Sequence, residues 1–152
     1  MSAQENWIYP SAFEPCVLTA TMVNGKPECT LRHLTSGEIE HPYLSFTDKT
    51  VCEGEQSIMQ CDVMQSKDGG KPYLMVTNVE KVGKRSFSDV TYGVKFELAS
   101  IVTDRTFFDP DDTGNTYRLR KPPLFHASEI KEFQEYILPN FYAKVLGGRF
   151  FH

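Results

Sequence analysis

Lysines, an arginine and aromatic rings recur through residues 66–87, SKDGGKPYLMVTNVEKVGKRSF. Cationic side chains can bind the phosphates of single-stranded nucleic acid, and aromatic rings can stack on its bases. The alternative is a solvated hairpin whose lysines stop its edge from pairing with other chains, with the rings in the core. We predict a nucleic-acid-binding surface formed by Lys67, Lys71, Tyr73, Lys81, Lys84, Arg85 and Phe87.

A second basic segment, YRLRKPP at residues 117–123, could extend this surface. In an extended conformation Arg118 and Arg120 lie on the same side, and Lys121 adds a third cation. The prediction requires that the fold bring the two segments side by side.

Charge is distributed unevenly along the chain. Residues 1–62 contain three basic and nine acidic side chains, whereas residues 63–96 contain six basic and three acidic ones. The formal net charge of −4 gives no overall attraction to nucleic acid or anionic membranes. Any binding to nucleic acid would therefore depend on a local basic surface.

Histidine and cysteine could form a nucleophilic site, but no catalytic motif is present. The histidines lack H-x-x-x-H spacing, and the chain has neither G-x-S-x-G nor a Gly-rich phosphate loop. A dyad of Cys29 with His33, or of Cys61 with a distant histidine, would form only if the fold joined its members. Because thiols at inward strand positions are usually inert, we expect a protein that is not an enzyme.

Patterns that would bind a metal are also weak. The segment DPDDTGN resembles the start of an EF-hand loop, but Thr113 and Arg120 occupy the positions where that loop requires acids. It is better interpreted as a turn. Glu14, Glu38 and Glu40 could form a carboxylate pair, although solvated acids are the ordinary explanation. We expect neither a metal nor another cofactor.

The cysteines and the N-terminus indicate the compartment. Cys16, Cys29, Cys52 and Cys61 form no C-x-x-C pair, and three of them lie within alternating apolar segments. This favours small buried side chains in a reducing environment over zinc ligands. The N-terminus lacks the features of a signal peptide, and no run of 18 apolar residues occurs. We expect an intracellular protein of the cytoplasm or nucleus, without a membrane association.

Apolar residues alternate in several segments and predict the strands that would position these side chains. Residues 16–23 and 28–34 flank Asn24-Gly25, the strongest short signal for a hairpin. Residues 57–64 and 72–82 form a second predicted hairpin. A short strand is predicted at 43–46 and the longest one at 91–102.

The C-terminal segment changes to a helical period and is rich in aromatic residues. Ser128 is the predicted N-cap of a helix that Pro139 should interrupt. A single helix would not bury all of the aromatic rings in this segment. One alternative is that two helical pieces share the rings around the core. We predict an interface with a second subunit or a protein partner at Phe133, Tyr136, Phe141, Tyr142, Phe150 and Phe151.

These elements predict a mainly β fold: a small, OB-like β-barrel or compact sandwich of about five to six strands with a C-terminal α-helix. A single domain over 1–152 would comprise an N-terminal arm (1–13), a β core (14–104), a loop (105–125) and the C-terminal helix and tail (126–152). The predicted function is a non-catalytic module that binds single-stranded nucleic acid. The alternative is an interaction or assembly subunit that uses its β edges and C-terminal aromatics.

Overall fold

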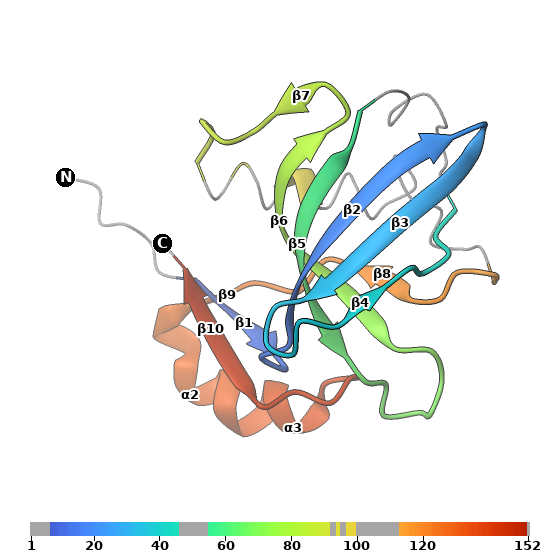
Figure 1. The fold of residues 1–152 in the computed structure, drawn as a ribbon. Helices are drawn as coiled ribbons and strands as arrows, with labels where there is room; N and C mark the ends of the chain where they lie inside the picture. The colour runs from blue at the N-terminus through green and yellow to red at the C-terminus, as the bar shows by residue number, and fades with distance from the viewer. Residues whose placement is uncertain (1–6, 46–54, 92–93, 95–96, 100–112, 152) are drawn as a thin grey trace.

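The structure is a computed structural model that describes residues 7–45, 55–91, 94, 97–99 and 113–151 (Figure 1). It is mainly β, with one large sheet that curls into a half-barrel and a C-terminal helical segment at 127–140. The predicted fold class is therefore confirmed.

The first predicted hairpin is present. Strand β2 (Pro15–Val23) pairs antiparallel with β3 (Lys26–His33) through a two-residue turn. Asn24 and Gly25 both have positive φ, at 52° and 75°, as a type I′ turn requires. This turn fixes the register, so Leu18 lies opposite Leu31 and Cys16 lies opposite His33.

The second predicted hairpin continues the sheet. Strand β5 (Ser57–Met64) pairs with both β2 and β6 (Tyr73–Val82). Two short strands, β4 (Ile39–Glu40) and β7 (Arg85–Ser86), complete the order β4-β3-β2-β5-β6-β7. Strand β8 (Arg118–Arg120) lies parallel to the first residues of β6, within a region that the sequence predicted to be a loop.

The two faces of the large sheet contact different parts of the chain. The inner face packs Leu18, Leu31, Leu74 and Leu119 into the main core. On the opposite face, Tyr73 and Met75 pack with Phe141 and Ala143 from the C-terminal segment. Alternation along β6 and β8 therefore sends neighbouring side chains to different surroundings.

A smaller sheet joins the two ends of the described chain. Its central strand β1 (Trp7–Ser11) pairs antiparallel with β10 (Gly147–Phe151) on one side and β9 (Phe125–His126) on the other. The sequence predicted an arm and a tail for these ends. Gly148 permits the close packing, since a Cβ there would lie 2.7 Å from atoms of Ile8 and Phe133.

The C-terminal helical segment changes its winding along its length. A 3-10 turn η2 (Ala127–Glu129), α2 (Ile130–Glu132), a π turn η3 (Phe133–Ile137) and α3 (Leu138–Asn140) follow one another. Pro139 does not break the helical segment, but the winding changes just before it, and Pro139 lies in the first turn of α3 as the sequence predicted. A first-turn position suits proline, which has no N–H to donate. The N-cap is His126 rather than Ser128, and its side chain accepts from the Ser128 amide at 3.2 Å.

Two predicted strands differ from the structure. Residues 43–45 are not in a strand, and the rest of that prediction lies outside the described residues. In the predicted strand 91–102, Val94 and residues 97–99 are helical instead. A short apolar run does not distinguish the two states, and Glu97, Leu98 and Ala99 all favour a helix. Leu98 and Ala99 pack consecutively against the main core.

Candidate functional site

The parallel pairing of β8 with β6 brings the two basic segments of the sequence together. Tyr73 lies opposite Arg118, and Met75 lies opposite Arg120. The turn that precedes Tyr73 carries Lys67 and Lys71. We call the cations gathered at this end of β6 the basic cluster: Lys67, Lys71, Arg118, Arg120 and Lys121.

Arg118 is the best-anchored member of the basic cluster. Its Nε donates to the Lys71 carbonyl at 3.0 Å, its Nη1 to the Tyr73 hydroxyl at 2.8 Å and its Nη2 to Asp68 Oδ1 at 3.1 Å. The guanidinium also lies 4.6 Å from the centre of the Tyr73 ring. A Cβ on Gly70 would approach Nη2 to 2.1 Å, so a larger residue there would require the end of the Arg118 side chain to shift.

Among the residues that the structure describes, Tyr73 and Tyr142 lie at the basic cluster, and they differ in accessibility. Tyr73 is only 6% exposed, between Arg118 and the ring of Tyr142, whose centre is 4.8 Å away. Tyr142 is 43% exposed. Burial raises the pKa of Tyr142 and nearby Arg120 opposes that rise. Of these two described rings Tyr142 is therefore the accessible one, whereas Tyr73 is covered and packs against Arg118 and Arg120.

The lysines of the cluster are positioned by backbone carbonyls. Lys67 Nζ donates to the Pro139 carbonyl at 3.0 Å, and Lys71 Nζ donates to the Thr113 carbonyl. The turn is further fixed to the C-terminal segment, because the Lys67 amide donates to the Tyr142 carbonyl at 3.3 Å. A carbonyl partner orients an ammonium group without neutralising its charge.

Among the described residues, one carboxylate, that of Asp68, forms an ion pair with a member of the basic cluster. Hydrogen bonds from Ser66, the Gly70 amide and Arg118 lower the pKa of Asp68, so it is ionised at neutral pH. Five cations against one anion leave the described cluster with a clear positive excess.

The remaining predicted cations lie at the other end of β6. Lys81 forms an ion pair with Glu55 at 2.8 Å, and Lys84 is exposed in the turn toward β7. Arg85 lies 5.7 Å from the ring of Phe87, which packs partly against the main core. The predicted surface therefore divides into two groups, of which only the basic cluster combines both basic segments.

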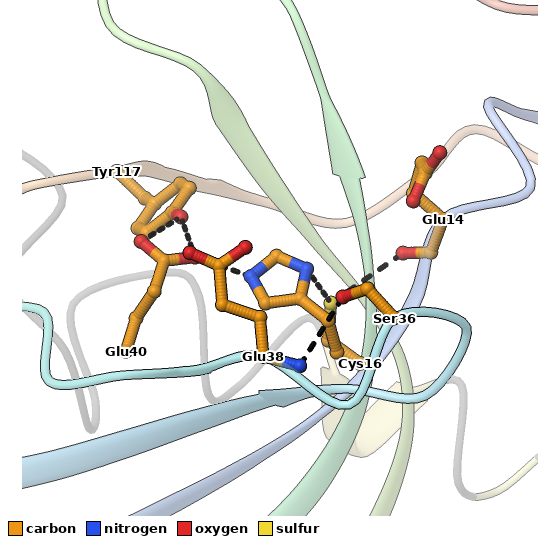
Figure 2. Close-up of polar contacts among 7 residues, drawn as sticks. Glu14, Cys16, Ser36, Glu38, Glu40 and Tyr117 are labelled. Carbon is orange, nitrogen blue, oxygen red and sulfur yellow. Dashed lines mark hydrogen bonds and ion pairs between the residues drawn. The ribbon is translucent and has the colours of Figure 1, made fainter.

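A second polar assembly lies on the inner side of β8, at Tyr117 (Figure 2). We call the chain Cys16–His33–Glu40–Tyr117 the thiol–imidazole network. Cys16 Sγ lies 3.3 Å from His33 Nδ1, His33 Nε2 contacts the Glu40 carboxylate, and the Tyr117 hydroxyl donates to both Glu40 oxygens at 2.9 Å. A thiol, an imidazole and a carboxylate thus follow one another as in a nucleophilic triad.

The environment of Cys16 opposes nucleophilic chemistry. The residue is 1% exposed, and its thiol also donates to the Glu14 carbonyl at 3.5 Å. Burial, followed by the charges of Asp62, Glu14 and Glu40, raises its pKa to about 12. Reactive cysteines need an accessible, electropositive site, and this one is buried among acids. The network is therefore better suited to joining strands β2, β3 and β4 to Tyr117 than to catalysis.

The signal for this network was present in the sequence. The type I′ turn at Asn24-Gly25 sets Cys16 opposite His33, whereas the predicted dyads used Cys29 or Cys61. Cys29 lies opposite Ala20, and Cys61 lies on the other side of Cys16. Cys16, Cys29 and Cys61 are all buried, and Cys52 lies outside the described residues.

The C-terminal aromatics predicted at an interface divide by burial. Phe133 and Phe141 are buried, whereas Tyr136, Tyr142 and Phe150 are exposed. The side chain of Phe151 lies outside the described part of the structure.

Within the described residues, no group of three or more His, Cys, Asp or Glu side chains could hold a metal ion. None of the helices among them is long and apolar enough to cross a membrane. No protein-family model matches the sequence, and no curated protein matches it significantly.

Proposed function

We propose that this protein is a non-catalytic module that binds single-stranded nucleic acid at the basic cluster. The supporting observation is the pairing of β8 with β6, which places Arg118 and Arg120 beside the turn that carries Lys67 and Lys71. A strand of phosphates would contact these cations in turn, and counterion release would supply much of the binding free energy.

The exposed ring of Tyr142 supplies the second component of this proposal. It lies against Tyr73, and Tyr73 in turn contacts Arg118 and Arg120. A base that stacked on Tyr142 would have its phosphate within the cluster's positive potential. Stacking on aromatic side chains contributes about 1–3 kcal/mol per base and depends little on sequence. We therefore propose weak sequence preference.

Binding of a fluorescent oligothymidylate across a salt series tests the proposal. Replacing Lys67, Lys71 and Lys121 with Gln should reduce the slope of log K against log salt by about 2, because each lost phosphate contact removes roughly 0.7. Arg118 is left intact in this variant because it also supports Tyr73.

The matched control replaces Lys81, Lys84 and Arg85 with Gln, which changes the net charge by the same amount at the other end of β6. This control should leave the slope unchanged. Equal effects of the two triple variants would show that binding follows net charge rather than the basic cluster. Absence of binding at low salt would refute the proposal.

A second candidate function, assembly with another subunit or protein, is favoured by the exposed C-terminal aromatics. Tyr136 is 62% exposed and Phe150 is 53% exposed, and rings this accessible are typical of interfaces. Light scattering of the intact chain and of a Tyr136→Ser, Phe150→Ser variant tests it. Point changes are preferable to truncation because residues 147–151 pair with β1. A monomer in both cases would exclude self-assembly through these rings.

A further inference from the structure

A groove of about 440 Å³ lies between the corner that leads into β2, the turn after β3 and the segment before β10. It is independent of the basic cluster. Its walls combine the carboxylates of Glu14 and Glu38 with the apolar side chains of Val63 and Leu146. Leu146 is 79% exposed, the most accessible large apolar side chain in the described part of the molecule. The groove therefore presents negatively charged side chains beside an exposed apolar surface.

The corner beside the groove is built rigidly around a buried carboxylate. Asp62 is buried, and its oxygens accept hydrogen bonds from the Ser11 hydroxyl at 2.8 Å, the Ala12 amide at 2.9 Å and the Glu14 amide at 2.8 Å. The Phe13 amide donates to the Ser11 hydroxyl at 3.0 Å. Four hydrogen bonds thus fix the backbone of a four-residue corner.

This corner keeps Phe13 in an unfavourable conformation and in solvent. Phe13 has a φ of 54°, which costs a non-glycine residue about 1–2 kcal/mol, yet its side chain is 45% exposed. Its ring lies next to the chain that follows Leu146, since a Cβ on Gly147 would be 3.4 Å from Phe13 Cε2. An exposed aromatic ring held against strain is typical of a functional surface.

The acidic side chains of the groove lack ionic partners in the described structure. Glu40 is engaged by His33 and Tyr117, but neither Glu14 nor Glu38 forms an ion pair with any described cation. Figure 2 shows both carboxylates beside the thiol–imidazole network, with the Glu38 backbone held by Ser36. Lys144 also lines the groove, and its backbone amide donates to the Gln65 carbonyl at 2.8 Å.

From these observations we propose that the groove binds an extended segment of a partner protein in which arginine or lysine alternates with a large apolar residue. The apolar side chain would pack on Leu146 and Phe13, which would otherwise remain in water. The flanking cation would pair with Glu14 or Glu38. Charge complementarity of this kind selects a basic segment over an acidic one.

The test uses the full chain labelled with nitrogen-15 and three synthetic hexapeptides. The first is acetyl-Gly-Leu-Arg-Phe-Arg-Gly-amide; the second carries glutamate for arginine, and the third carries serine for leucine and phenylalanine. Only the first should perturb the amide resonances of residues 12–14, 36–38 and 144–146. The first should also bind at least about tenfold more tightly than either of the others, because the second peptide loses both cations and the third loses both apolar side chains.

Variants decide whether the binding uses the proposed contacts. Replacing Glu14 and Glu38 with Gln should weaken the first peptide about fivefold, and Leu146→Ser should weaken it by a similar factor. The matched control, Glu132→Gln with Glu135→Gln, removes two exposed carboxylates of the C-terminal helical segment and should have no effect. Equal binding of the glutamate peptide, equal weakening by the control or resonance changes elsewhere would each overturn the proposal.

Discussion

Two neighbouring residues of one segment, Tyr117 and Arg118, belong to regions with opposite character. Tyr117 donates to Glu40 in the thiol–imidazole network, where each side chain has a partner within the protein. Arg118 belongs to the basic cluster, where five described cations face a single described carboxylate. A region whose polar groups are satisfied internally stabilises the fold, whereas a region with excess charge at the surface remains available for a ligand.

The two regions also differ in the direction in which the fold shifts the pKa values of their side chains. In the network, burial comes first among the causes that raise the pKa of Cys16 and of Tyr117, so both side chains stay protonated. In the cluster, hydrogen bonds lower the pKa of Asp68, so the charged form is favoured. A triad-like order of groups is therefore insufficient for catalysis, because the surroundings decide which protonation state exists.

The largest expected effect is on stability, from His33→Ala. This change separates Cys16 from Glu40 and should lower the free energy of unfolding by about 2–3 kcal/mol. Urea denaturation measures the loss. His41→Ala is the matched control, since His41 is exposed and has one weak contact with Thr30 at 3.5 Å. The folded His33→Ala variant should bind oligothymidylate with unchanged affinity, because the thiol–imidazole network and the basic cluster are separate regions. A loss of affinity would show that the two regions are coupled.

An intermediate effect is expected at alkaline pH, from the thiol of the network. The folded pKa of Cys16 is about 12, above the value of 9.0 for an unperturbed thiol. Above pH 9 the unfolded chain therefore binds fewer protons than the folded one, and the free energy of unfolding should be about 1 kcal/mol lower at pH 10 than at pH 9. Cys16→Ser removes this ionisation with little change in shape. Parallel stability curves for the two proteins between about pH 9 and 11 would refute the assignment.

The smallest expected effect concerns the basic cluster, from Asp68→Asn. The substitution removes the one carboxylate described there and keeps an acceptor for the Gly70 amide, which donates at 2.7 Å. Oligothymidylate should bind about two- to threefold more tightly at low salt, with stability nearly unchanged, because an exposed ion pair contributes about 0.2–1 kcal/mol. The same change at Asp89, which is also exposed and lies beyond β7, is the control. Weaker binding by the Asp68→Asn variant would show that Asp68 organises Arg118 rather than opposing the ligand.

Local signals predicted the parts of the fold that local physics determines. The Asn24-Gly25 turn and the alternating strands on either side of it were confirmed, as was the hairpin of β5 and β6. The change of period near Ser128 correctly indicated the C-terminal helical segment. In each case backbone preference and apolar pattern agree over a continuous stretch.

Long-range pairing accounts for most of what the sequence did not predict. Strands β1 and β10 pair with each other although they lie at opposite ends of the described chain. Neither strand has a strong alternating apolar pattern of its own. The helical state of residues 97–99 depends on the core that Leu98 and Ala99 contact. The burial of Tyr73 likewise depends on Tyr142 and Arg118, which no local pattern could place there.

The parallel contact between β8 and β6 has a consequence for the order of folding. Arg118 and Tyr73 are 45 residues apart, and contacts of such sequence separation form late because a long loop must first close. The β2–β3 hairpin is closed by a two-residue turn, so it can form much earlier than this long-range contact. We therefore expect only the fully folded molecule to bind an anionic strand. Partly folded or newly synthesised chains would lack the assembled basic cluster.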